Sequence, residues 1–101
     1  MANISTLFVA LADPTRRKLF ERLAVKSMPV GDLAKGLPVT RPAVSQHLKV
    51  LYDAGLVTVR EDGTKRIYSL DPKGVEVMRT YLDRMWDRAL LGFKAAIEKK
   101  D

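Results

Sequence analysis

The residues best suited to chemistry in this chain are polar side chains that recur on one side of a short segment. At about 100° per residue, a helix over residues 40–53 gathers Val44, Leu48 and Leu51 on one side and polar residues on the other. Hydroxyl and amide groups at this spacing can hydrogen-bond base edges in a DNA major groove, while cations can neutralise phosphates. The residues expected to read or position DNA in this segment are Thr40, Arg41, Pro42, Ser45, Gln46 and Lys49.

Local signals define the helix that carries this polar set. Thr40 is a favoured N-cap, Pro42 is tolerated in a first turn, and Gly55 is suited to ending the helix. Residues 29–37 predict a shorter helix before it, and Pro38-Val39 forms a brief link between the two. Two helices joined by a tight turn, the second displaying polar residues, are typical of a helix-turn-helix.

A β-hairpin is predicted directly after the second helix. Residues 57–61 and 65–70 are rich in β-branched and aromatic side chains and flank Asp62-Gly63, a strong turn dipeptide. A hairpin in this place would form a wing. Its cations, expected to anchor the wing on phosphate or in a minor groove, are Arg60, Lys65 and Arg66.

With these elements in place, the chain resembles the ArsR/SmtB family of bacterial winged-helix repressors. The resemblance is carried by residues 11–17 (LADPTRR), 32–34 (DLA), 44–51 (VSQHLKVL), 54–57 (AGLV) and 63–70, in the family's order and spacing. It implies a mainly α fold with a small β-hairpin wing, in the order α-α-α-α-β-β-α. The Trp-bearing terminal helix is similar to the cysteine-free branch of the family rather than to its metal sensors.

Composition is consistent with one small basic domain. The chain has 101 residues, 47% hydrophobic content and a net charge of +6, so we expect a single domain over residues 1–101. The charge favours a nucleic-acid partner, although it would equally favour an anionic membrane surface. No apolar run has the length of a membrane span and no signal-peptide pattern is evident, so we expect no membrane partner and a cytoplasmic location. The lack of cysteine excludes disulfides and zinc–thiolate sites.

Apolar stripes at both ends of the chain predict a homodimer. One stripe lies near the N-terminus, and a longer one follows the helix-start signal Asp71-Pro72 at steps of three and four residues. A small domain cannot cover so long a stripe, so part of it should face a second copy. The resemblance implies the same pairing of terminal helices. The expected interface residues are Ile4, Leu7, Phe8, Leu11, Met78, Leu82, Met85, Trp86 and Phe93.

Several other features have a structural explanation beside a functional one. We expect His47, the single histidine, to pack or orient the helix, with DNA contact as the alternative. The basic run 16–18 is expected to be a solvated face, with phosphate binding as the alternative. Asp83 and Asp87 are expected to pair with Arg79 and nearby cations. The stripe around Trp86 indicates core or interface more than a ligand pocket.

The pattern as a whole predicts a regulator rather than an enzyme. There is no cysteine nucleophile, second histidine or glycine-rich phosphate loop. The resemblance places Pro29 and Gly31 where metal-responsive relatives carry a thiolate pair, and residues 72–101 hold no histidine, so we expect no metal and no cofactor. The prediction is a homodimeric, sequence-specific repressor that binds an inverted-repeat operator on double-stranded DNA and does not respond to metals.

Two alternatives remain open at this stage. A winged-helix module that binds protein would use its basic charge only for solubility. A regulator that responds to an organic ligand would hold it at the dimer interface. Steep salt dependence of duplex-DNA binding separates the DNA-binding predictions from the first alternative, because phosphate neutralisation releases counterions. The sequence identifies neither the operator nor an effector.

Overall fold

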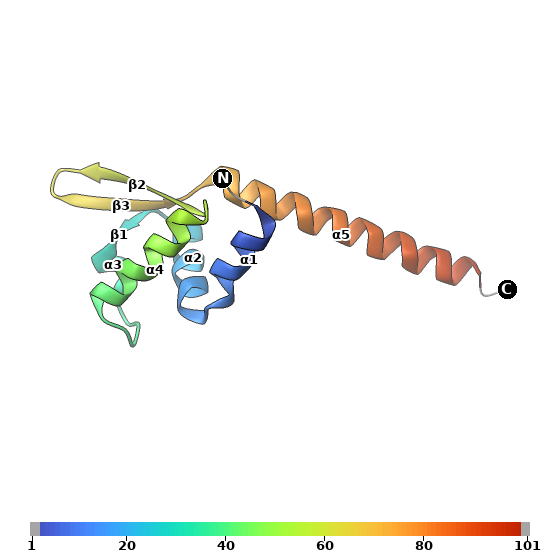
Figure 1. Cartoon of the computed structure of the whole chain (residues 1–101), viewed down its shortest axis with the longest axis horizontal. Coiled ribbons are helices and arrows are strands. Elements are labelled where there is room, and N and C mark those ends of the chain that lie inside the picture. Colours follow the sequence, from blue (N-terminus) through green and yellow to red (C-terminus); the bar gives the residue numbers. More distant parts are fainter. Residues whose placement is uncertain (1–2, 100–101) are drawn as a thin grey trace.

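A small antiparallel sheet lies along one side of a group of helices in the computed structural model, which describes residues 3–99 (Figure 1). The helices are α1 (Ile4–Ala12), α2 (Pro14–Val25), α3 (Val30–Ala34), α4 (Arg41–Asp53) and α5 (Pro72–Glu98), and the strands are β1 (Met28–Pro29), β2 (Val57–Asp62) and β3 (Lys65–Leu70). The mainly helical fold with a hairpin wing is the one that the sequence predicts. The ends of the expected domain, residues 1–2 and 100–101, lie outside the described residues.

The predicted helix starts are confirmed by their capping hydrogen bonds. The hydroxyl oxygen of Thr40 accepts from the backbone N–H of Ala43 at 3.2 Å, and the carboxylate of Asp13 accepts from that of Arg16 at 3.0 Å. Asp71 caps α5 in the same way, and α2, α4 and α5 each have proline in the first turn. A side-chain oxygen at the cap satisfies an N–H that has no partner within the helix, so these boundaries are set locally.

The wing is a two-stranded hairpin whose loop lies one residue later than predicted. Asp62 pairs with Lys65, so the loop consists of Gly63 and Thr64 rather than being centred on Asp62-Gly63. Gly63 has φ 64°, a left-handed conformation that glycine adopts without steric cost. Strand β3 lies in the middle of the sheet, between β2 and the short strand β1.

The helix predicted over residues 29–37 is shorter than expected. Its first residue, Pro29, belongs to β1 and pairs with Ile67 of β3. Proline cannot donate a backbone hydrogen bond, so its place in an edge strand is favourable. α3 ends at Ala34, and the chain turns at Gly36, where φ is 74°. The link to α4 therefore spans residues 35–40, not Pro38 and Val39 alone.

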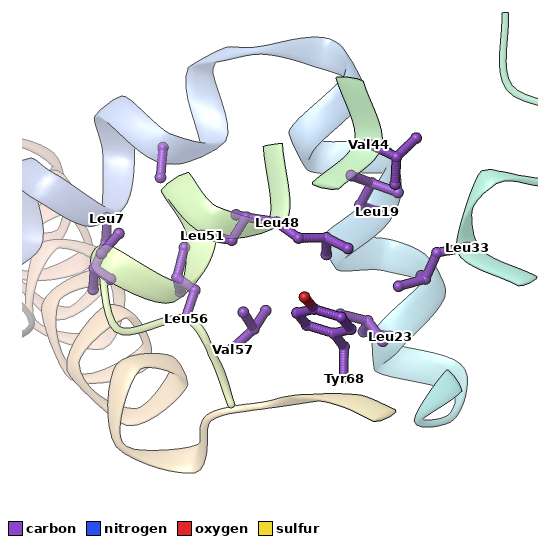
Figure 2. Packing of buried hydrophobic residues seen from close by; sticks show 12 residues of the cluster. Leu7, Leu19, Leu23, Leu33, Val44, Leu48, Leu51, Leu56, Val57 and Tyr68 are labelled. Atoms are coloured by element: carbon purple, nitrogen blue, oxygen red, sulfur yellow. The ribbon is translucent and has the colours of Figure 1, made fainter. Parts of the chain in front are cut away.

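A single core joins the helices to the wing (Figure 2). Its largest completely buried side chains are Leu7, Leu19, Leu33, Val44, Leu48, Leu51, Leu56 and Val57. Leu7 of α1 has no exposed surface, so its assignment to the dimer interface was wrong. The stripe on α1 faces the chain's own core at that position because α2, α4 and α5 all pack against α1.

Helix α5 leaves the domain after its first turns and extends alone (Figure 1). At about 1.5 Å per residue, its 27 residues span about 40 Å, which makes the molecule 66 Å long but only 27 Å and 21 Å across. Among the described residues of α5, only Gly74 is buried. Within residues 3–99, no helix combines the length and apolar character that a bilayer crossing requires.

The start of α5 is fixed directly to the end of α4. The N–H of Asp71 donates to the carbonyl of Leu56 at 2.8 Å. Gly74 lies so close to Gly55 that a Cβ atom at position 74 would overlap the Gly55 carbonyl oxygen. The start of α5 therefore meets the turn that follows α4 backbone to backbone, with no side chain of the described residues between them at this point.

Candidate nucleic-acid interface

Helix α4 presents the predicted polar residues on its outer side. Its inner residues Val44, Leu48 and Leu51 are completely buried, which fixes the rotation of the helix about its axis. Within residues 3–99, neither Ser45 nor Gln46 uses its side chain in a hydrogen bond, so both remain able to bind a partner. The exposed members of the predicted set on α4 are Arg41, Pro42, Ser45, Gln46 and Lys49.

Two members of that set already have partners within the chain. The hydroxyl of Thr40 is occupied as the N-cap of α4, so this residue positions the helix. The ammonium of Lys49 lies 3.1 Å from a carboxylate oxygen of Asp53, one turn further along α4. An exposed pair of this kind contributes only about 0–1 kcal/mol, so a DNA phosphate can replace Asp53 at little cost.

A groove of about 420 Å³ runs between α4 and the wing. Ser45 and Lys49 line it on the helix side, and Arg66 and Tyr68 line it on the wing side. The guanidinium carbon of Arg66 lies 5.9 Å from the centroid of the Tyr68 ring, within cation–π range. Because Tyr68 is itself part of the core, this contact holds a cation beside the exposed face of α4.

The strand register separates the cations that were expected to anchor the wing. Arg66 lies opposite Glu61 and two residues before Tyr68, so it shares the face of the sheet that packs toward α4. Arg60 falls on the alternate face and has its guanidinium 3.9 Å from Asp62. Lys65 stands beside the loop at the hairpin tip and lines a recess there. The alternation of side chains along a strand could have shown this difference from the sequence.

Helix α2 braces α4 through a cluster that includes His47. The Nδ1 atom of His47 lies 3.9 Å from the Asp13 carboxylate and 3.4 Å from a guanidinium nitrogen of Arg16. Acceptance of the Arg16 backbone N–H lowers the pKa of Asp13, and the charges of His47 and Arg16 lower it further. These distances favour the expected orienting role for His47.

The basic run after Asp13 does more than form a solvated face: Arg16 is half-buried, and Arg17, although exposed as expected, also binds within the chain. Arg16 Nε donates to the carbonyl of Ala10 at 2.6 Å, and an Arg17 nitrogen donates to that of Leu11 at 3.1 Å. Helix α1 has no basic residue in its own last turn, so α2 supplies the cations that satisfy its terminal carbonyls.

Arg22 does the same for α3 and was not identified from the sequence. One guanidinium nitrogen donates to the carbonyl of Leu33 at 2.8 Å and to that of Lys35 at 2.6 Å. These contacts hold the end of α3 and the start of the turn that leads to α4. Spacing along the chain carries no signal for them, because they join residues 11 and 13 positions apart.

The expected dimer residues divide between the domain and the free part of α5. Leu11 and Met78 are half-buried and pack against the core, and Ile4 does the same. Phe8 stays 41% exposed although its ring packs edge-on against Tyr81, with the centroids 5.6 Å apart. Met85 is intermediate, and the members of the prediction that are more than half exposed are Leu82, Trp86 and Phe93. Ile97, at the end of the predicted stripe, is exposed as well, and so are the unpredicted Leu90 and Leu91.

A second groove follows the inner side of α5 near its start. It has a volume of about 960 Å³ and is lined by Ile4 of α1 and by Val77, Tyr81 and Met85 of α5. Charged residues of α5, including Glu76 and Arg84, form its edge. Along residues 3–99, no three His, Cys, Asp or Glu side chains are grouped so that they could hold a metal ion.

Comparisons with known proteins agree with this architecture. Residues 11–60 match a family described as a helix-turn-helix domain. The chain is 57% identical over 91 residues to the HTH-type transcriptional regulator Rv2034 of Mycobacterium tuberculosis, covering 90% of this chain and 85% of that protein. It is 31% identical to the arsenical resistance operon repressor of Staphylococcus xylosus, over 80% of this chain and 78% of the repressor.

Solved structures give the same result. A possible transcriptional regulator for arsenical resistance matches with a TM-score of 0.72 and 42% identity, over 88% of this chain and 96% of that one. An ArsR family transcriptional regulator, RHA00566, matches with a TM-score of 0.75 and 28% identity, over 82% and 91%. Because these likenesses extend across the winged domain, the chain belongs to the ArsR/SmtB family of DNA-binding transcriptional regulators and is not an enzyme.

Proposed function

We propose that this regulator is a homodimeric repressor that binds an inverted-repeat operator. The observation that carries the proposal is the exposed polar face of α4, where Ser45 and Gln46 make no side-chain hydrogen bond within the described part of the chain, with Arg66 of the wing held beside it. Ser45 and Gln46 would read base edges, and Lys49 and Arg66 would bind phosphates. Such a role would place the protein in the cytoplasm with the DNA that it controls.

Selection from a random duplex library, followed by titration of the winning sequence, tests the proposal. We expect an inverted repeat whose half-sites lie about one helical turn apart, or a multiple of it. The logarithm of the affinity should fall linearly with the logarithm of the salt concentration. An asymmetric single site would contradict the proposal. Binding to a protein partner without salt dependence would instead favour the interaction module.

Gln46 offers the sharpest test of base reading. A glutamine amide can pair with adenine through two hydrogen bonds, so Gln46→Ala should relax the preference at one base position by about 1–3 kcal/mol. Lys94→Ala, far along α5, is a matched control that should leave the preference unchanged. If the selected sequence is the same for Gln46→Ala and wild type, Gln46 does not read DNA.

We propose that the dimer forms through α1 and α5, with residues 1–101 acting as one domain. The uncovered apolar side chains of α5 support this, because an exposed stripe of that length is unfavourable in water. A two-fold interface would bring the same surface from each copy together. Phe8, Trp86 and Phe93 would be central to it.

We propose further that metals do not release the DNA. Relatives include an arsenical resistance operon repressor and a probable mercury resistance operon repressor, the latter from Streptomyces lividans. This chain has no cysteine, and Pro29 and Gly31 carry no side-chain donor atom for a metal. Operator-binding anisotropy should therefore be unchanged by low-micromolar zinc, cadmium, nickel or arsenite. A stoichiometric loss of affinity that a chelator reverses would contradict this.

The groove along α5 favours a second candidate, a repressor released by an organic ligand. Its apolar wall and its edge of charged side chains suit an amphipathic molecule. Screening small amphipathic acids and amines for a change in operator affinity tests this candidate. Release by one of them that is lost in Arg84→Ala, which changes a groove residue outside the expected interface set, would support it. A negative screen would leave the simple repressor.

A further inference from the structure

A small recess lies where the start of α3, the first turns of α4 and the wing tip meet. Its volume is about 270 Å³, and its polar lining comes from Arg41 and Ser45 of α4 and from Thr64, Lys65 and Arg66 of the wing. The groove along α4 contains Asp53 and the groove along α5 contains Glu76, whereas the lining of this recess includes no carboxylate. Glu61 and Asp62 lie opposite Arg66 and Lys65 on strand β2, but neither lines the recess, and a lining of cations and hydroxyls favours an anion.

Gly31 of α3 leaves the space that Arg41 occupies. A Cβ atom at position 31 would lie 3.0 Å from a terminal guanidinium nitrogen of Arg41 and 3.6 Å from its central carbon. Gly31 does not have a positive φ, so the backbone itself does not require glycine there. Within residues 3–99, no salt bridge engages Arg41. The Arg41 guanidinium is therefore held beside the recess with no carboxylate of the described residues within salt-bridge distance to neutralise its charge.

On the other side of the recess, Arg66 of the wing is also held in place by a contact within the chain. Arg66 is held over the ring of Tyr68, and both residues line the recess as well as the groove along α4. Ser45 lies one helical turn after Arg41, on the same side of α4, and lines both cavities too. Two guanidinium groups and a hydroxyl from α4 and β3 thus surround one opening.

We propose that this recess seats one phosphodiester of the DNA backbone, held between Arg41 and Arg66, and that Gly31 is the positioning residue that keeps the seat open. The planar fork of a guanidinium matches two phosphate oxygens, which makes arginine the favoured partner for such a group. The seat adjoins the face that carries Gln46, and a fixed phosphate contact sets the register in which a helix meets the bases. The inference rests on the proposed DNA binding.

Substitutions at Gly31 test the seat without removing any charge. In Gly31→Leu the side chain would displace the Arg41 guanidinium, while leucine in a helix favours folding relative to glycine. We expect about tenfold weaker operator binding at 0.1 M salt and a salt slope reduced by about one. Gly31→Ala, whose single methyl group only crowds a flexible side chain, should lose about two- to threefold.

Matched variants separate the seat from a general loss of charge. Arg41→Ala should equal Gly31→Leu in affinity and slope, and the double variant should be no weaker than Arg41→Ala alone, because both act on the same contact. Lys94→Ala removes one positive charge far from the recess and should keep the wild-type slope. If Gly31→Leu folds, as judged by its circular dichroism, and keeps wild-type affinity and slope, the proposal is overturned.

A phosphate titration distinguishes the two sources of such an anion. Potassium phosphate is added to wild-type protein against potassium chloride of equal ionic strength, and the amide signals of Gly31 and Ser45 are followed by NMR. Saturation at low millimolar phosphate, with no change of DNA slope in Gly31→Leu, would assign the seat to a free phosphate and overturn the DNA assignment. Wild type that binds no duplex DNA would refute the proposed function itself, whereas normal wild-type binding with an indifferent Gly31→Leu refutes only the seat.

Discussion

Helices α4 and α5 are both amphipathic, but only α4 has its apolar side covered by its own chain. Val44, Leu48 and Leu51 of α4 are 0% exposed, whereas Trp86 and Phe93 of α5 are 66% and 67% exposed. The same pattern of spacing thus has two different outcomes. The winged part of the chain completes its own core, while most of α5 is left without a partner.

The difference indicates how assembly and DNA reading are connected. The contact of Gly74 with Gly55, together with the Asp71–Leu56 hydrogen bond, joins the start of α5 to the short turn that follows α4. A partner that fixes the direction of α5 would therefore also restrain the turn from which α4 is displayed. In a symmetric dimer, this would set the spacing between two reading helices.

Replacing Phe93 with aspartate should produce the largest effect, because Phe93 belongs to the exposed apolar side of α5. A charge buried at the proposed interface without a partner should abolish the dimer and lower operator affinity by at least a hundredfold. The circular dichroism of the winged domain should remain. Sedimentation equilibrium and operator titration measure these results. A dimer of unchanged affinity would show that Phe93 lies outside the interface.

Gly74→Ala acts on the joint between the two regions. The added methyl group would overlap the Gly55 carbonyl oxygen, which is backbone and cannot rotate away, so we expect a loss of about 1–3 kcal/mol in the free energy of unfolding. Urea unfolding measures it. Gly92→Ala, on the exposed part of α5 with no atom within 4 Å of the added group, is the matched control and should not be destabilised. Equal stability of the two variants would refute the close joint.

The pH dependence of stability tests the contribution of Asp13 to the cluster with Arg16 and His47 that links α2 to α4. Its pKa is lowered below the ordinary 3.8, chiefly because its carboxylate accepts the Arg16 N–H. A carboxyl with a lowered folded pKa stabilises the fold above the ordinary pKa and loses that contribution as the pH falls through the lowered value. Asp13→Asn should therefore unfold at lower urea than wild type at pH 7, and the two should converge as the pH falls below the lowered pKa of Asp13. A gap that persists in acid would contradict this.

Asp53→Asn should give the smallest effect and sharpen the account of α4. The exposed pair with Lys49 contributes little, so the free energy of unfolding should change by about 0.5 kcal/mol or less. Operator affinity should rise about two- to threefold at low salt, because Lys49 is freed and a negative charge leaves the DNA face. Lower affinity would show that the Lys49–Asp53 pair positions Lys49 for its contact.

Features set by neighbouring residues could be predicted from the sequence. The caps Asp13, Thr40 and Asp71 each satisfy an N–H within three residues, so their signals are local. The recognition helix and the hairpin follow from hydrophobic period and turn chemistry in the same way. Strand β1 could not be found, because two residues show no period and the strand exists only through pairing with β3.

Features set by tertiary packing were missed or misassigned. A stripe on α1 is visible in the sequence, but whether Leu7 faces the chain's own core or a second copy depends on how α2, α4 and α5 surround it. The carbonyl contacts of Arg16, Arg17 and Arg22 depend on where two helix ends meet in space. The close approach of the Arg41 side chain to Gly31 likewise links α3 to α4 across a turn, and the sequence does not specify the path of that turn.

Sedimentation velocity of the protein with a fluorescent operator duplex tests the central claim most directly. The account predicts that the free protein sediments as a dimer at micromolar concentration and that two chains bind each inverted repeat. It also predicts that Phe93→Asp sediments as a monomer and leaves the duplex free at the same concentration. A wild-type protein that is monomeric and binds the operator as one chain per duplex would contradict the account.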